Sequence, residues 1–143
     1  MADRQVIADF ARSMGIATSG LRAQAGRMRV ISENIANADS TASTSGGEPY
    51  RRKIPSFSSE LDRTLDASVV SLGKIRPDTS AFRVKHEPGN PAADAAGNVK
   101  YPNVNPLIEM TDMRDAQRSY EANLNIISAT RRMIQRTLDI LKA

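Results

Sequence analysis

The chain has no cysteine, no tryptophan and a single histidine among its 143 residues. Without cysteine there can be no disulfide, no cysteine-bound zinc and no thiol nucleophile. The single His86 excludes a metal site built from several histidines. It follows Lys85 and precedes Glu87 at the end of an expected strand, where neighbouring side chains point to opposite faces. We therefore expect no cofactor, no metal and no enzymatic activity.

Aromatic residues make up only 4% of the chain, whereas hydrophobic residues make up 40%. Leucine, isoleucine, valine, methionine and alanine must therefore supply most of the packing. Such a composition favours narrow contacts between helices over one thick core. At this length the chain forms one domain, or a small domain with long appendages.

No apolar run is long enough to span a bilayer, and Asp3 and Asp9 interrupt the N-terminal region where a signal peptide would be apolar. We expect no transmembrane segment and no cleaved signal peptide. The net charge of +4 is spread over both ends of the chain, so nucleic acid is not expected as a partner. The densest basic cluster, residues 51–53, is expected to be a solvated loop.

Apolar residues recur at alternating steps of three and four along residues 6–37. This spacing predicts a long helix with a heptad seam. The seam comprises Phe10, Met14, Ala17, Leu21, Gln24, Met28, Ile31 and Ile35. Three glycines lie off the seam and cost roughly 1 kcal/mol each relative to alanine. Packing against other elements or other chains must therefore hold this helix.

Residues 106–141 repeat the pattern, with Asn105 placed to cap the helix and Pro106 suited to its first turn. The second seam comprises Met110, Met113, Gln117, Tyr120, Leu124, Ile127, Arg131, Ile134, Leu138 and Leu141. The polar members of both seams either fix the register or face a wet or interchain surface. A second row, Ile126, Met133 and Ile140, is left uncovered, which indicates lateral packing against copies or partners.

These patterns predict a mainly α fold, whose long N- and C-terminal helices pack as a coiled-coil-like pair around a small β-containing middle insert. Residues 1–38 and 106–143 would form the terminal helical domain. Residues 39–105 would form loops and the middle domain. Within it, we expect a short helix over residues 58–72, a strand before the Pro-Gly-Asn-Pro turn, and a second strand that ends at Pro102.

Four segments carry a resemblance to known proteins: SGLRAQAGRMRVISENIANADST, GEPYRRK, HEPGNPAADAAGNVKYPNVNPLIEM and RSYEANLNIISATRRMIQRTLDILKA. They resemble the bacterial flagellar rod and hook proteins, in order and over nearly the whole chain. The amide-rich SENIANADST is shared by that wider family. The PGNP and PNV segments are more specific to a component of the proximal rod, although Glu87 replaces the aspartate of that pattern.

The resemblance implies a structural subunit of the proximal rod, with paired terminal helices in a D0-like domain lining the inner tube. Implied partners are copies of itself, other rod proteins, the MS-ring and export gate, and the distal rod. The implied location is the periplasmic rod of the basal body, reached by type III export without cleavage. The alternatives are another flagellar rod component, or a helical adaptor or export-associated protein.

Two asparagines in SENIANADST lie beside the first seam. Asn37 suits either a helix C-terminal cap in the left-handed conformation or a subunit contact. Asn34 lies a turn earlier, and we expect it to bond a backbone or amide group where helices pack, near Asn123. The residues expected at the assembly interface are Met14, Leu21, Met28, Ile31, Asn34, Ile35, Asn37, Tyr120, Asn123, Leu124, Ile127, Ile134 and Leu138.

Overall fold

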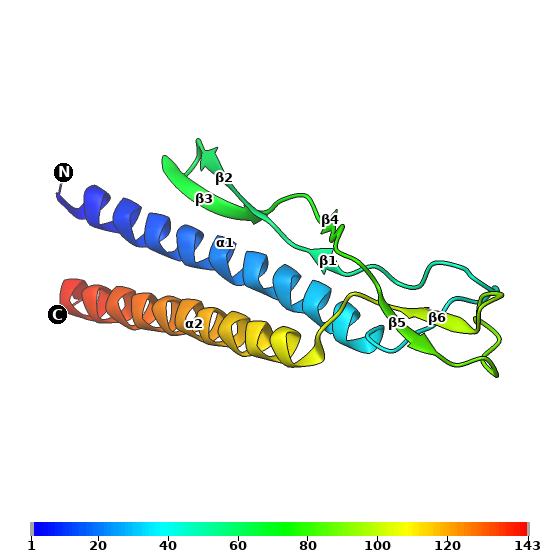
Figure 1. Cartoon of the computed structure of the whole chain (residues 1–143). Coiled ribbons are helices and arrows are strands. Elements are labelled where there is room, and N and C mark those ends of the chain that lie inside the picture. The colour runs from blue at the N-terminus through cyan, green and yellow to red at the C-terminus, as the bar shows by residue number, and fades with distance from the viewer. Residues whose placement is uncertain (1, 143) are drawn as a thin grey trace. The chain divides into compact units, whose positions relative to one another are not determined.

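A computed structural model describes residues 2–142 of the chain, with the side chains of residues 4–142. Within these residues two long helices, α1 (Ala2–Ala36) and α2 (Pro106–Lys142), come before and after a region of short antiparallel strands along the chain (Figure 1). The strands are β1 (Lys53–Ile54), β2 (Phe57–Asp62), β3 (Ala67–Leu72), β4 (Arg76–Pro77), β5 (Arg83–His86) and β6 (Asn98–Tyr101). The predicted terminal helices and the small β-containing region between them are confirmed.

The chain folds into two compact units, and both helices contribute to each. Unit 1 comprises the residues up to Arg27, Phe57–Gly73 and the residues from Asp115 onward. Unit 2 comprises Met28–Ser56 and Lys74–Arg114. The β2–β3 hairpin therefore belongs to unit 1, whereas the β1–β4 and β5–β6 pairs belong to unit 2.

The start of α2 follows from its local sequence. The side chain of Asn105 accepts the backbone N–H of Leu107 at 3.1 Å, and its carbonyl accepts the N–H of Glu109 at 3.1 Å. Pro106 has no N–H to leave unsatisfied in the first turn. The predicted cap at Asn105 is therefore confirmed.

In unit 1 the helices run antiparallel, so the first turns of α1 lie beside the last turns of α2 (Figure 1). Midway along α1, Gly20 faces Asn123 of α2. A Cβ at position 20 would lie 2.9 Å from the side-chain nitrogen of Asn123. Glycine at position 20 therefore lets α1 and α2 approach more closely than any larger residue would allow. This close approach explains why a glycine stands here although it weakens the isolated helix.

The short helix predicted over residues 58–72 is wrong, because this segment forms the β2–β3 hairpin. Phe57 pairs with Leu72, and Ser58 pairs with Ser71. The two serine hydroxyls lie 2.8 Å apart and hydrogen-bond across the strands. The β-branched residues Val69 and Val70 of β3 suit a pleated surface better than a helix.

The hairpin is held against α1 through backbone and apolar contacts. The N–H of Val70 donates to the hydroxyl of Ser19 at 3.2 Å. Leu72 lies over Gly26, where an added Cβ would be 2.8 Å from the leucine side chain. Contacts between residues about 50 positions apart thus favour the strand over the local helical pattern.

In unit 2 strand β6 and the segment that joins β5 to β6 form a small apolar core. Val99 is completely buried, and it clusters with Ala92 and Tyr101. The hydroxyl of Tyr101 donates to the carboxylate of Glu87 at 2.8 Å, which ties β6 to the Pro-Gly-Asn-Pro turn. Both strands predicted beside this turn are confirmed, and the second ends before Pro102.

Candidate functional site

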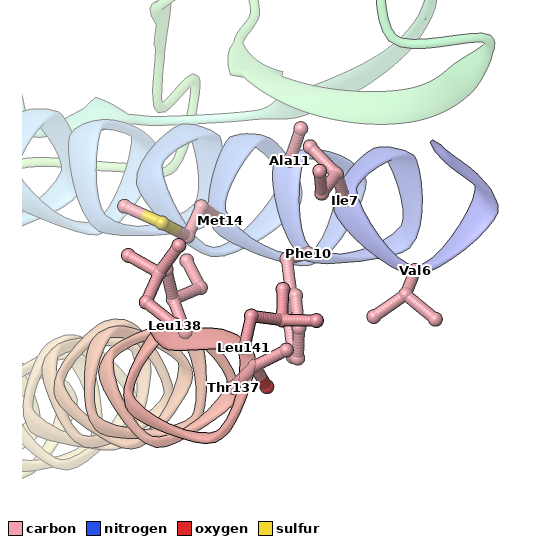
Figure 2. Close-up of a pocket in the computed structure, with 9 residues that line it drawn as sticks. Val6, Ile7, Phe10, Ala11, Met14, Thr137, Leu138 and Leu141 are labelled. Atoms are coloured by element: carbon pink, nitrogen blue, oxygen red, sulfur yellow. The ribbon is translucent and has the colours of Figure 1, made fainter. Parts of the chain in front are cut away.

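An apolar groove of about 310 Å³ lies where the free ends of α1 and α2 meet in unit 1. Figure 2 shows Phe10 and Met14 pointing from α1 toward Leu138 and Leu141 on α2. The lining residues of this terminal groove are Val6, Ile7, Phe10, Ala11, Met14, Ile134, Thr137, Leu138 and Leu141. Among the predicted interface residues, the groove brings together Met14, Ile134 and Leu138.

The most deeply buried positions of α2 in unit 1 carry small residues. Ala116 is completely buried, Thr130 is 1% exposed, and Asn123 between them is partly buried. These three positions are seven residues apart and so share one helix face. The predicted seam is only partly covered, because Ile127 and Ile134 are partly buried whereas Leu124 and Leu138 are exposed.

Large apolar side chains of α2 stay exposed on both sides of this inner face. Leu124 and Leu138 form a first flank and are 42% and 44% exposed. Ile126, Met133 and Ile140 form a second flank and are 46%, 48% and 76% exposed. At about 100° per residue, positions 124 and 126 lie on opposite sides of Asn123. The uncovered second row predicted from the sequence is confirmed.

The predicted interface residues differ widely in their exposure within the chain. Ile31 and Asn34 are buried, at 2% and 1% exposure, whereas Leu124 and Leu138 are exposed. The partly buried ones are Met14, Leu21, Met28, Ile35, Asn37, Tyr120, Asn123, Ile127 and Ile134. Ile31 and Asn34 therefore face the interior of their own chain, and the assembly role of the whole set stays a prediction.

Asn37 ends α1 without the left-handed conformation that its residue type suggested. Among the described residues other than glycine, Asp66 alone has a positive φ. Asn37 instead donates its backbone N–H and its side-chain amide to the carbonyl of Glu33, at 3.1 and 2.8 Å. The left-handed expectation is wrong because the backbone N–H of Asn37 continues the helical hydrogen-bonding pattern, and the side chain adds a second bond to the same carbonyl.

Asn34 lies in a cluster of buried and partly buried polar groups in unit 2. This polar cluster comprises Asn34, Tyr50, Arg52, Lys53, Asn103 and Glu109. Asn123, which was expected near Asn34, donates its side-chain amide to the carbonyl of Ser119 at 3.0 Å. The expected bond of Asn34 to a backbone group is present, but its partner is Lys53 of the same chain.

The expectation that residues 51–53 form a solvated loop is wrong. The guanidinium of Arg52 is 22% exposed and pairs with Glu109 at 2.5 Å, Asp78 at 3.4 Å and Asp112 at 3.8 Å. Glu109 is 1% exposed. A carboxylate at such burial requires a charged or hydrogen-bonding partner, which draws Arg52 inward.

Two pKa shifts reflect this environment. Burial, followed by the negative charges of Glu33 and Glu109, raises the pKa of Tyr50 to about 12. For Arg52, burial lowers the pKa, but hydrogen bonding and charge from Glu109 and Asp78 outweigh it and raise the pKa above its ordinary value. The cluster therefore keeps Tyr50 neutral and Arg52 charged over a wide range of pH.

Sequence reasoning missed Glu109 and Arg52 as members of a site. One signal was available: Glu109 lies seven residues before Ala116 and fourteen before Asn123, on the face that α2 buries. A carboxylate on a buried helix face predicts a basic partner elsewhere in the chain. Nothing in the sequence shows that Arg52, rather than a neighbouring basic residue, is that partner.

Among the described residues, no group of three or more histidine, cysteine, aspartate or glutamate side chains is arranged to hold a metal ion. Within the same residues, neither helix has a stretch long and apolar enough to cross a membrane.

Comparison with known proteins identifies the class. Residues 14–42 match the family described as flagella basal body rod protein. Residues 95–140 match the C-terminal family of the flagellar basal body rod FlgEFG proteins. The two matched regions cover most of α1 and α2, the helices that bear the groove and the flanks. The fold and its helix surfaces therefore belong to a structural protein of the flagellar rod class.

Individual relatives narrow this class. Flagellar basal-body rod protein FlgC of Agrobacterium fabrum is 54% identical over 128 residues, covering 90% of this chain and 92% of that protein. FlgC of Bacillus subtilis is 41% identical, covering 91% and 97%, and FlgC of Salmonella typhimurium is 37% identical, covering 87% and 92%. The chain belongs to the FlgC family of flagellar basal-body rod proteins, as its sequence resemblance predicts.

Proposed function

We propose that this chain is a non-enzymatic subunit of the proximal rod, which assembles with its own copies and with other rod proteins through the flanks of its terminal helices. The observation that supports this most directly is the exposure of large apolar side chains on both sides of the inner face of α2. The second flank is exposed at three successive heptad positions, Ile126, Met133 and Ile140.

Apolar burial supplies the energy for such assembly. Covering one large aliphatic side chain stabilises a complex by about 1.5–3 kcal/mol. Because the flanks lie on opposite sides of the helix, one neighbour cannot cover both. Each α2 would therefore pack between two further helices, in coiled-coil-like contacts at seven-residue spacing. The terminal groove lies beside Leu138, so a neighbour that covers the first flank could also fill it.

The resemblance and the relatives support the rest of the proposal. Residues 1–38 and 106–143 would form the inner helical domain of the rod, with residues 39–105 as a middle domain outside it. Neighbours would include the MS-ring and export gate on one side and the distal rod on the other. The subunit would reach the periplasmic rod by type III export without cleavage of a signal peptide.

A charged substitution on the second flank tests the proposal. Met133→Asp should abolish incorporation into the rod, because the carboxylate would be buried without a partner when a neighbouring helix packs there. The measurement is the amount of the variant in basal bodies purified from cells that have no other copy. Helix content by circular dichroism should stay at the level of the unchanged chain.

The matched control is Asn125→Asp, which places the same charge on an exposed position of α2 outside both flanks. This variant should assemble normally. Incorporation of Met133→Asp at the level of the control would show that the second flank is not an interface. Loss of incorporation in both variants would show that added charge on α2, rather than the flank, is responsible.

A further inference from the structure

The side chain of Asn34 uses its whole hydrogen-bonding capacity inside the chain. Its oxygen accepts from the hydroxyl of Tyr50 at 2.8 Å and from the backbone N–H of Lys53 at 2.9 Å. Its nitrogen donates to the carbonyl of Lys53 at 2.8 Å and to the carboxylate of Glu109 at 3.0 Å. A primary amide has two donors and two acceptor sites, so an asparagine matches this position completely.

Asn103 makes a comparable set of bonds, one of them to Arg52, the residue before Lys53. Its oxygen accepts the backbone N–H of Arg52 at 2.8 Å. Its nitrogen donates to the carbonyl of Asp78 at 3.0 Å and to the hydroxyl of Ser80 at 2.9 Å. Asn34 lies near the end of α1 and Asn103 lies just before α2. Together they accept the backbone N–H groups of two successive residues, Lys53 and Arg52.

Glu109 joins these two arrangements through its carboxylate. One oxygen accepts from Asn34 at 3.0 Å and the other from the guanidinium of Arg52 at 2.5 Å. Removal of any of these three groups would leave a buried polar atom of another without its partner. Such an atom costs about 1–3 kcal/mol, so the cluster should form and open as a unit.

We propose that the polar cluster is a conformational lock, in which Asn34 positions the backbone of Lys53, and Glu109 the side chain of Arg52, only when the end of α1 and the start of α2 lie together. Neither helix alone supplies the complete site. The order of residues 50–53, and of strand β1 that begins at Lys53, is therefore coupled to the pairing of the two helices. Asn34, residues 50–53 and Glu109 come from three of the four segments that resemble the rod and hook proteins.

The test measures hydrogen exchange at the backbone amide of Lys53 in the whole chain, by NMR. Asn34→Asp replaces the donor that faces Glu109 with a carboxylate oxygen, so two negative groups oppose each other. We expect Lys53 exchange to rise roughly tenfold or more, because the cluster opens more often. The amides that pair β5 with β6 should keep their rates, since they lie outside the cluster.

A second substitution makes the test specific. Glu109→Gln alone should also speed Lys53 exchange, since it weakens the bond to Arg52. In Asn34→Asp/Glu109→Gln the new amide can donate to Asp at position 34, so the double variant should exchange more slowly than the product of the two single effects predicts. Asn125→Asp is the matched control and should leave Lys53 exchange unchanged.

The outcomes separate clearly. Faster exchange confined to the cluster, with partial recovery in the double variant, supports the lock. Unchanged exchange at Lys53 overturns it, as does a uniform rise across unit 2 without recovery. The experiment uses the isolated chain, so a failure of the lock and a failure of rod assembly are distinguishable.

Discussion

The two units of the chain differ in what they bury. In unit 1 the fully buried residues that the structure describes are all small: Ala17, Ala23, Ala116 and Thr130. In unit 2 the buried residues include larger ones: Val99, Tyr101, Val104, Asn34 and Glu109. Unit 2 therefore closes its own interior, whereas unit 1 leaves many of its large apolar side chains exposed.

The largest effect expected from a single change lies in the core of unit 2. Val99→Asp would place a charge at a completely buried position, at a cost of about 3–5 kcal/mol. Unit 2 should lose its fixed structure. The measurement is NMR, in which the signals of β5 and β6 should disappear. Val84→Asp is the matched control on the adjacent strand, where Val84 is 58% exposed. If both variants behaved alike, unit 2 would have no closed interior.

A smaller effect is expected on acidification, again in unit 2. Hydrogen bonds from Tyr101 and then Asn90 lower the pKa of Glu87, and hydrogen bonds from Ser80 lower the pKa of Asp78. Both carboxylates bind protons more weakly when folded, so their contribution is present above the ordinary pKa values and is lost as pH falls through the lowered ones.

Urea unfolding of unit 2, followed through the NMR signals of β6, should therefore show falling stability from about pH 5 toward pH 3. Glu87→Gln should reduce this dependence. Glu48→Gln, at an exposed position, is the matched control and should preserve it. A pH dependence that Glu87→Gln leaves intact would show that other groups are responsible.

The smallest effect is expected at the exposed ion pair of unit 1. Arg12 lies 3.3 Å from Asp66, whose side chain is 82% exposed. Asp66→Asn removes the charge but keeps a residue type that tolerates the positive φ at this turn. The free energy of unfolding should change by less than about 1 kcal/mol. A larger loss in the melting curve would mean that unit 1 depends on this pair.

Both helices could be predicted because their apolar residues recur with helical spacing and Asn105 caps the second. The β2–β3 hairpin could not be predicted, since Ser58 and the acids after it also suit a helix start. Its structure depends on contacts such as Val70 with Ser19, which are 51 residues apart. Local sequence preference does not contain that information.

The candidate site was predictable to a similar extent. The second flank of α2 follows from its seven-residue spacing, and its exposure is confirmed. The inner face carries small and polar residues, which leave no apolar pattern to detect. The polar cluster joins Asn34 to Glu109 across 75 positions. Side-chain geometry in three dimensions determines such a pairing, and helical periodicity does not report it.

Tyr50 gives the polar cluster an intrinsic optical reporter. The chain has no tryptophan and three tyrosines, so tyrosine dominates its near-ultraviolet absorption. Inside the cluster the pKa of Tyr50 is raised from 10.0 to about 12 by burial and by Glu33 and Glu109. A chain with an open cluster would form tyrosinate at a lower pH than one with a closed cluster. Because the pKa of Tyr101 is also raised, by its hydrogen bond to Glu87, only the part of the alkaline absorbance change that Tyr50→Phe removes would follow the pairing of the helix ends.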